Sequence, residues 1–457
     1  MTKARVAKVA KPAARISPAE RRAAGEAARA RVPPSDHGSW HPAPDRPDPI
    51  ALLEEQAATR LPDLVPIRYS RMAASPFDFY RGAALPMAAD LARLPRSDIV
   101  VQLCGDAHLS NFGLFASPER TEVFDITDFD ETLHGPFEWD LKRLAASLVL
   151  AGRSRGFTEH DGRHAAHRAI RSYRTRMAGF ATMRAIDVYY AQVDVASILG
   201  VADKHARPFL QETVHSASHH DALHELPKLT AVDAAGRPRI VDHPPVITHP
   251  ADATPARIDD ALAGYRDTLE EDRRALLDRY QIADVALKVV GVGSVGLAAF
   301  AVLLVGDSDA DPLFLQVKQA EASILERFLP ASAQPSHGAR VVIGQRRLQA
   351  ASDMFLGWAV GDQGRHLYVR QLQDQKGGAV ISAMTADDLA VWGELCGWAL
   401  ARGHARLGQP AEIAGYLGDD EIFEHALTEF AIAYADQTDT DHQALLDAIA
   451  SGRVTAS

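Results

Sequence analysis

The residues best suited to chemistry lie close together in the first third of the chain. Asp106, His108 and Asn111 share one short stretch, and Asp128 and Asp130 follow it. Carboxylate and amide oxygens are the ligands that a hard cation such as Mg²⁺ prefers, and a positioned carboxylate can take a proton from a hydroxyl. The simpler interpretation is a polar turn with solvated acids. We favour a site, because polar groups of these types rarely cluster without a shared role.

Two predicted strands would position these side chains. The apolar run at 99–104 is typical of a buried strand, and it leads directly into Gly105. Residues 121–131 alternate between apolar and polar types and predict a second strand that ends in acids. Functional groups concentrate in the loops at the ends of such elements. We therefore expect the two groups of polar residues to meet.

A second informative stretch follows Asp284, where glycines form a G-x-G-x-x-G pattern. Such glycines let backbone N–H groups approach phosphate oxygens. A dinucleotide-binding fold would continue with a helix, whereas a kinase-type loop would continue with strands and a lysine. Here residues 297–305, a polar turn and residues 313–318 predict a hairpin that ends in Lys318, which favours the kinase type. The residues expected to cover phosphates are Gly291, Gly293, Ser294 and Gly296.

The composition is that of an ordinary globular protein, with 457 residues, 47% of them hydrophobic. The formal net charge of −11 argues against a surface that binds nucleic acid throughout. The two cysteines cannot form a disulfide framework and suit a reducing cytoplasm, our predicted location. The uncharged run between Lys288 and Asp307 is short and rich in glycine. It indicates buried strands, and we expect no membrane span.

Residues 1–45 are basic and rich in Pro and Ala, and we expect a disordered tail with one helix at 18–31. Weak nucleic-acid contact is expected only there. Arg68, Arg71 and Arg81 precede the acidic stretch and either bind phosphate or pair with acids, with ion pairing slightly favoured. His220 and His224 have the i, i+4 spacing of a metal pair, but a solvated helix face is the favoured interpretation.

The acidic stretch resembles the catalytic segment of aminoglycoside phosphotransferases and choline kinase-like enzymes, which have a protein-kinase-like fold. That family has a G-D-x-H-x-x-N loop, an acid strand and then a D-L helix start. The matching residues are Gly105, Asp106, His108, Asn111, Asp128, Phe129, Asp130, Asp140 and Leu141. The resemblance implies that Asp106 is the catalytic base and Asp140 a structural acid. It implies a bound ATP whose α- and β-phosphates Lys318 reaches. The implied Mg²⁺ ligands are Asn111, Asp128 and Asp130.

The order of these parts is reversed relative to the kinase family. The glycine loop follows the catalytic loop by about 180 residues, Cys104 replaces a histidine, and Asp130 replaces a glycine. A kinase-like fold therefore requires circular permutation, which is tolerated where domain termini lie close together. We expect an α+β protein of two lobes. A large helical lobe at 46–283 would carry the acids. A small β lobe at 284–376 would bind nucleotide, with a hinge at 373–377. Helices at 377–457 would pack on the large lobe.

The partner of Lys318 is predicted to be Glu321, on a helix after the lysine. A second predicted helix at 341–352, which carries Gln345, is the alternative. Over roughly residues 45–450 the chain also resembles the uncharacterised bacterial family called domain of unknown function 2252. The phrases that carry this resemblance include residues 75–82, 105–113, 315–318 and 368–371.

The favoured function is an ATP- and Mg²⁺-dependent phosphotransferase that acts on an unidentified hydroxyl acceptor, either a small molecule or a protein. A metal-dependent phosphoester hydrolase is the second hypothesis, because two metals can be held by clustered acids without a nucleotide. Its ligands would be Asp106, His108, Asp125, Asp128 and Asp130. A nucleotide-binding module without catalysis is the third. A dinucleotide-dependent oxidoreductase ranks last, because only the glycines support it.

Overall fold

The computed structural model describes residues 16–457 with short gaps. The gaps are 202–203, 205, 219–228, 234–235, 251–257, 259–261, 263, 290, 292, 294, 309–310, 362–363, 373–376 and 379. The fold mixes helices with antiparallel sheets, which confirms the predicted α+β class. Ser294, His219, His220, His224 and residues 373–376 of the expected hinge at 373–377 lie outside the described residues.

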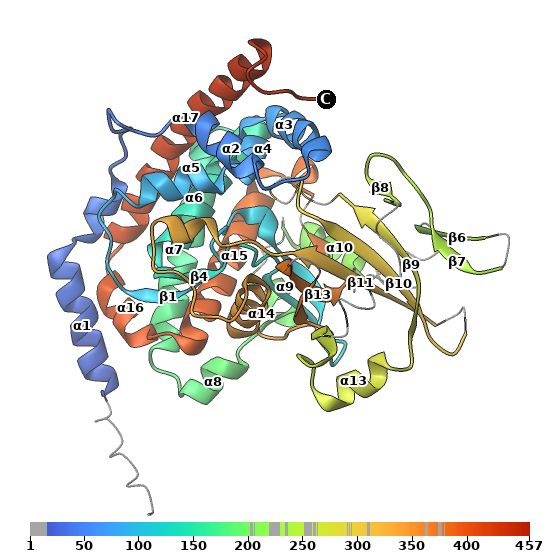
Figure 1. The fold of residues 1–457 in the computed structure, drawn as a ribbon. Coiled ribbons are helices and arrows are strands. Elements are labelled where there is room, and N and C mark those ends of the chain that lie inside the picture. Colours follow the sequence, from blue (N-terminus) through green and yellow to red (C-terminus); the bar gives the residue numbers. More distant parts are fainter. Residues whose placement is uncertain are drawn as a thin grey trace, which may run out of the picture.

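The largest sheet has six strands and lies to one side of the helices (Figure 1). Its spatial order is β12-β13-β11-β10-β9-β8, and every neighbouring pair is antiparallel. The strands are β8 (Ile247–Thr248), β9 (Gln281–Lys288), β10 (Ala299–Val305), β11 (Pro312–Gln319), β12 (Gly357–Val360) and β13 (His366–Gln371). The sheet thus begins before residue 284, where we predicted the start of the small lobe.

The hairpin of β10 and β11 confirms the predicted strand that carries a lysine. Ala299, directly after the glycine loop, is the register partner of Lys318. Both strands are buried along most of their length because apolar residues occupy both faces. Helix α14 (His337–Leu348) is capped by Ser336, whose side chain accepts the Ala339 N–H. The helix covers β12 and β13.

The acidic stretch connects two smaller sheets. Strand β1 (Val100–Leu103) pairs with β4 (Leu133–Pro136), and β2 (Phe112–Ala116) pairs with β3 (Glu122–Ile126). Strands β5 (Val193–Asp194) and β14 (Gly377–Gly378) extend the second sheet. The loop between β1 and β2, with the single turn η3 (Leu109–Asn111), carries the first polar group. The loop after β3 carries the second.

Long helices form the main core. Helix α6 (Glu138–Ser154) is buried from Glu138 to Gly152, and α7 (Glu159–Phe180), α15 (Ala386–Leu407) and α17 (Ile422–Ala450) pack around it. A Cβ on Gly397 would lie 2.1 Å from the Ala169 carbonyl oxygen, so α15 and α7 approach closely because a glycine is there. Figure 1 shows these helices crossing beside the smaller sheets.

The expected disordered tail is wrong for residues 16–45. The helix expected there is present as α1 (Pro18–Arg31), followed by the turn η1 (Pro34–Gly38). Helix α1 packs against α16 (Pro410–Leu417), with Gly25 and Gly415 at the crossing. His37 is fully buried, and its Nε2 lies 2.6 Å from the Tyr416 hydroxyl. This segment therefore belongs to the folded part of the molecule.

The remaining elements are short. Five of them precede β1 and form an interrupted helical segment. They are α2 (Pro49–Ala57), η2 (Pro62–Leu64), α3 (Val65–Ala73), α4 (Pro76–Gly82) and α5 (Ala84–Leu91). The others are α8 (Ala185–Tyr190), α9 (Val195–Val201), α10 (Arg207–Ser218), β6 (Thr230–Val232), β7 (Pro238–Ile240), α13 (Glu271–Leu277), η4 (Ile324–Arg327) and η6 (Ile381–Ala383). In the described part of the chain, no helix has both the length and the apolar character needed to cross a bilayer.

Candidate functional site

One cleft brings together the polar residues of the first third of the chain and the glycine loop. It encloses about 690 Å³ of space not filled by atoms, part of it open to solvent. Residues from the acidic stretch line one side. They are Asp106, His108, Asn111, Asp128, Asp130 and Glu131. Gly291 and Gly293 line it from the loop between β9 and β10, and Gln56, Arg60 and Arg81 line it from the N-terminal helices.

Asp140 holds the loop that carries Asp106. Its two carboxylate oxygens accept the backbone N–H groups of Cys104, at 2.8 Å, and Gly105, at 3.0 Å. Gly105 has φ +88°, and a Cβ there would lie 2.2 Å from the Glu131 carbonyl oxygen, so the turn requires glycine. Asp140 therefore supports the loop from the start of α6, in the structural role that the kinase resemblance implied for it.

Asp106 is positioned by an arginine. The Arg143 Nε donates to Asp106 Oδ1 at 2.7 Å, and the guanidinium lies 3.8 Å from the centre of the Tyr80 ring. Burial raises the pKa of Asp106, and the neighbouring Arg143 opposes that rise. The second oxygen, Oδ2, is 3.8 Å from His108 Nε2, and both residues line the cleft. Arginine stays charged under ordinary conditions, so it can orient Asp106 without competing for its proton.

His108 is buried and uncharged. Burial and the positive charges of Arg143 and Arg81 hold the pKa of its imidazole well below its usual value. Its Nδ1 is buried and has no hydrogen-bond partner among the described residues. A neutral imidazole can donate or accept one hydrogen bond at a ligand in the cleft.

Asp130 and Lys318 form an ion pair across the two halves of the site. The hydroxyl of Tyr368, on β13, donates to the other Asp130 oxygen at 2.8 Å. Burial alone would raise the pKa of Asp130, but Lys318 and Tyr368 bring it below its usual value. Burial would likewise lower the pKa of Lys318, but Asp130 raises it. Both groups are therefore charged, and they join residues 188 positions apart.

Asp128 is compensated less fully. Burial raises its pKa and the negative charge of Asp130 raises it further, and the positive charges of Lys318 and Arg370 only partly oppose that rise. Asn111 lies beside it in the lining of the cleft, and its side-chain N–H donates to the Asp106 carbonyl at 2.9 Å. That bond leaves the amide oxygen of Asn111 for the cleft. A carboxylate and an amide oxygen thus face the same space, and the carboxylate favours a nearby cation.

The expected pairing of Lys318 with Glu321 is wrong. Glu321 accepts a hydrogen bond from the Thr59 hydroxyl at 3.0 Å, and the chain after Lys318 forms only the single turn η4. The alternative, Gln345 on α14, donates to Gln349 instead. Neither Glu321 nor Gln345 pairs with Lys318, because Asp130 forms the ion pair with its ammonium group. One oxygen of Asp130 contacts Lys318 and the other accepts the Tyr368 hydroxyl. These two contacts also compete with the metal-ligand role expected for Asp130.

The glycine loop is tied to the N-terminal helices. Gly291 has φ +66° and Gly296 has φ +96°, values that glycine adopts readily. The Leu61 N–H donates to the Gly296 carbonyl at 2.8 Å, and Arg60 and Arg71 donate to the carbonyls of Val295 and Gly291. Arg71 therefore binds the loop, and Arg81 pairs with Asp78 at 3.1 Å. Among the described residues, Arg81 is the one of these three arginines that forms an ion pair, and its partner is the local Asp78 and not an acid of the acidic stretch.

Four cleft or near-cleft residues were missed by sequence reasoning, namely Arg60, Glu131, Arg143 and Tyr368. Burial raises the pKa of Glu131 to about 7, which its bond from the Ile324 N–H at 2.8 Å only partly offsets. Arg143 could have been found, because it follows Asp140 by three positions and so shares its face of a predicted helix. Arg60 and Tyr368 carried no local signal.

Residues 60–448 match the family described as "Uncharacterized protein conserved in bacteria (DUF2252)". The chain belongs to this family. The expected resemblance to this family is thus confirmed, and the match includes both Asp106 and Lys318. Comparisons with curated proteins and with solved structures gave no match. The family description names no activity.

Proposed function

We propose that this DUF2252 protein is an ATP- and Mg²⁺-dependent phosphotransferase that acts on a hydroxyl acceptor. One observation carries the proposal: Asp106, Asn111 and Asp128 line the same cleft as Gly291 and Gly293, and Lys318 is ion-paired to Asp130 at its wall. This combination offers a proton acceptor, oxygen ligands for a cation and backbone N–H groups for phosphate in one place. Phosphoryl transfer needs mainly such positioning and charge stabilisation.

The order of strands supports a kinase-like nucleotide site. In protein kinases a glycine-rich loop covers the phosphates and the lysine lies on the third strand. Here the glycine loop joins β9 to β10, and Lys318 lies on β11, the third strand of this antiparallel run. A helix, α14, and two further strands follow, as a permuted small lobe would require. The proposal includes the division into two lobes. Residues 46–283 and 377–457 would form the large lobe, and residues 284–376 would form the small lobe.

The residues present fit a magnesium ion. Asp128 is the buried carboxylate whose pKa is raised. The side-chain nitrogen of Asn111 makes the hydrogen bond to the Asp106 carbonyl, so the amide oxygen of Asn111 is left for a cation. These two groups would hold Mg²⁺, as hard oxygen ligands do. When bound, the ion would neutralise charge on the phosphates. Asp130 is a weaker candidate, because Lys318 and Tyr368 occupy its oxygens.

Asp106 would take the proton of the acceptor hydroxyl. Arg143 holds one of its oxygens and leaves the other toward the cleft. Neutral His108 is placed to orient the acceptor. Lys318 would exchange part of its contact with Asp130 for phosphate oxygens. That arrangement differs from the lysine–glutamate pair of protein kinases.

The hydrolase hypothesis loses one of its expected ligands. Asp125 is fully buried, and both of its oxygens accept bonds from Arg402 at 2.7 Å. It is therefore a structural residue away from the cleft. No observation favours a hydrolase over the phosphotransferase, and an inactive nucleotide-binding module becomes one outcome of the experiment below.

The test compares Asp106→Asn and Lys318→Met with the wild-type chain, by thermal shift with ATP with and without Mg²⁺ and by release of ADP with a panel of hydroxyl compounds. We expect Asp106→Asn to bind ATP–Mg²⁺ normally and to lose at least about 100-fold in turnover. Lys318→Met should weaken nucleotide binding about tenfold or more. Asp267→Asn, an exposed site, is the matched control.

Four results would contradict the proposal. Undiminished turnover in Asp106→Asn removes the base, and ATP–Mg²⁺ that leaves the wild-type melting temperature unchanged removes the nucleotide site. Nucleotide binding without turnover across the panel points to the inactive module. Metal-dependent cleavage of a phosphoester without ATP points to the hydrolase.

A further inference from the structure

A second group of chemically capable side chains lies between α7 and α17. His167 comes from α7, Glu421 directly precedes α17, and His425 lies in the first turn of α17. One ligand atom of each residue lies within 4.8 Å of those of the other two. Among the described residues, this is the one such group of three or more His, Cys, Asp or Glu side chains. None of the three lines the cleft described above.

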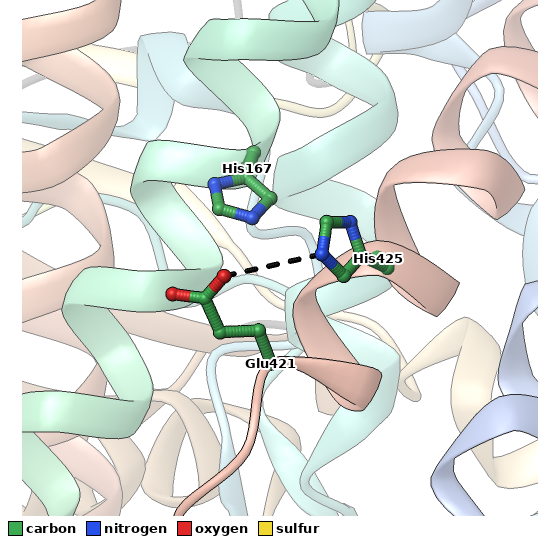
Figure 2. A group of neighbouring side chains, drawn as sticks. All are labelled: His167, Glu421 and His425. Atoms are coloured by element: carbon green, nitrogen blue, oxygen red, sulfur yellow. Dashed lines mark ion pairs between the residues drawn. The ribbon is translucent and has the colours of Figure 1, made fainter.

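The three side chains face a common point (Figure 2). Glu421 and His425 are four positions apart, so they lie on the same side of the helix start. Glu421 Oε2 is 3.9 Å from His425 Nε2, which is too long for a hydrogen bond. The rings of His167 and His425 have centroids 5.2 Å apart. The group is therefore close enough to share a ligand, and its members do not satisfy one another.

One buried atom lacks a partner. His167 Nε2 is shielded from solvent and has no hydrogen-bond partner among the described residues. Buried polar atoms without a partner are uncommon in native proteins and each calls for a cause. Glu421 and His425 are exposed, so an ion could reach the group from solvent. A cation bound here would give the His167 nitrogen the partner that it lacks.

The helices that carry the group are fixed on either side of it. Arg163 and Arg174 of α7 form ion pairs with Glu429 and Glu424 of α17, the second at 2.5 Å. Along α7, His167 lies between these two arginines. Helix α7 itself begins at a capping box. The backbone is thus held in place, which lowers the entropic cost of assembling ligands from two elements.

We propose that His167, Glu421 and His425 bind a divalent transition metal ion, with Zn²⁺ the best match. Two imidazole nitrogens and one carboxylate oxygen are a known zinc donor set, with a fourth position left to water. At a tetrahedral zinc ion the bonds to nitrogen and oxygen are about 2.0–2.1 Å long, so neighbouring ligand atoms lie roughly 3.4 Å apart. The ligand atoms of this group lie within 4.8 Å of one another and must therefore move closer together by about 1 Å. The exposed side chains of Glu421 and His425 can make that adjustment. The positive end of the α17 dipole opposes a cation, and the Glu421 carboxylate compensates for it.

The experiment titrates chelator-treated full-length protein with ZnCl₂ by calorimetry at neutral pH. We expect the wild-type chain to bind one more equivalent than His167→Ala, or to bind it at least tenfold more tightly. His425→Ala and Glu421→Gln should show the same loss. Glu421→Gln alters only an exposed side chain, so it keeps the test valid if a histidine variant folds poorly. His164→Ala, an exposed histidine on the same helix, should behave as wild type.

Cobalt supplies a second readout. Co²⁺ in the same site should give a visible absorption band that is lost in His167→Ala and retained in His164→Ala. The histidines at 219, 220 and 224 lie outside the described residues, so the difference between variants decides, and not the total metal bound. The proposal is overturned if all three site variants bind Zn²⁺ with wild-type stoichiometry and affinity. It is independent of the proposed phosphotransfer, because ATP binding by these variants should be unchanged.

Discussion

Asp130 controls the charge of the candidate site. It neutralises Lys318 and accepts a bond from Tyr368, while its own negative charge raises the pKa of Asp128. The Asp130 carboxylate therefore favours the charged form of Lys318. It also makes the negative charge on Asp128 less favourable unless a cation binds next to it. At Asp106, Arg143 opposes the rise in pKa that burial causes.

Glu131 should make the fold depend on pH. Its pKa is raised to about 7 by burial, whereas an unfolded chain would titrate near 4.5. The folded state therefore binds more protons between these values, and stability must fall as pH rises from about 4.5 to 7. We expect Glu131→Gln to remove this loss and to stabilise the protein by roughly 1–2 kcal/mol above pH 7.

Chemical denaturation at several pH values measures this effect. Below pH 4.5 the variant and the wild type should agree, because both side chains are then neutral. Glu119→Gln, at an exposed position, controls for the loss of one negative charge. A gain of stability that is equal at all pH values would refute the assignment to the buried carboxyl.

The elements around the site were predictable where their pattern was local. The run at 297–305, the polar turn and the strand ending in Lys318 have a period and length that the hairpin of β10 and β11 reproduces. The pairing of Lys318 with Asp130 was not predictable, because 188 residues separate them and several acids competed as partners. The same holds for Arg60 and Arg71, whose acceptors are backbone carbonyls of the glycine loop. A carbonyl acceptor leaves no trace in the sequence.

Gly291→Ala tests the glycine loop as an element. Gly291 has φ +66°, and no atom of the described residues lies within 4 Å of the position that a Cβ would take, so alanine adds backbone strain without a clash among them. We expect the loop to shift, and ATP affinity to fall about tenfold, because the N–H groups of the loop no longer converge on phosphate. Calorimetry with ATP–Mg²⁺ measures this.

The matched control is Gly156→Ala, between α6 and α7. Gly156 has φ +72° and likewise has open space, with nothing within 4 Å, where a Cβ would lie. Both variants should lose a similar amount of stability, roughly 1 kcal/mol, but only Gly291→Ala should lose nucleotide affinity. Equal affinities in the two variants would remove the glycine loop from the proposed site.

At the scale of the whole molecule, the N-terminal segment is part of the folded body. A Cβ on Gly25 would lie 1.9 Å from the Glu412 carbonyl oxygen, and one on Gly415 would lie 2.2 Å from that of Arg22. Disorder was predicted because the segment is rich in Ala, Pro and basic residues. Helices that pack through glycine and alanine offer almost no apolar stripe to detect, so the hydrophobic pattern could not reveal this contact.

Gly25→Leu should separate α1 from α16. A leucine cannot fit at this crossing, and overpacking of this kind costs about 1–3 kcal/mol or detaches the helix. Thermal unfolding should show a lower melting temperature, and limited proteolysis should show cleavage near residue 32. Ala24→Leu, at an exposed position of the same helix, should change neither. A Gly25→Leu protein as stable and as resistant as wild type would place α1 outside the folded body.

The main core joins Ala28 in α1 to Ala435 in α17. A ribosome releases the first of these residues long before the second, and it also releases the acidic loop about 180 residues ahead of the glycine loop. Many apolar residues of this core therefore cannot be fully buried in the nascent polypeptide until α17 has left the exit tunnel. A chain that ends before α17 would leave the rest of this core without the residues that α17 contributes.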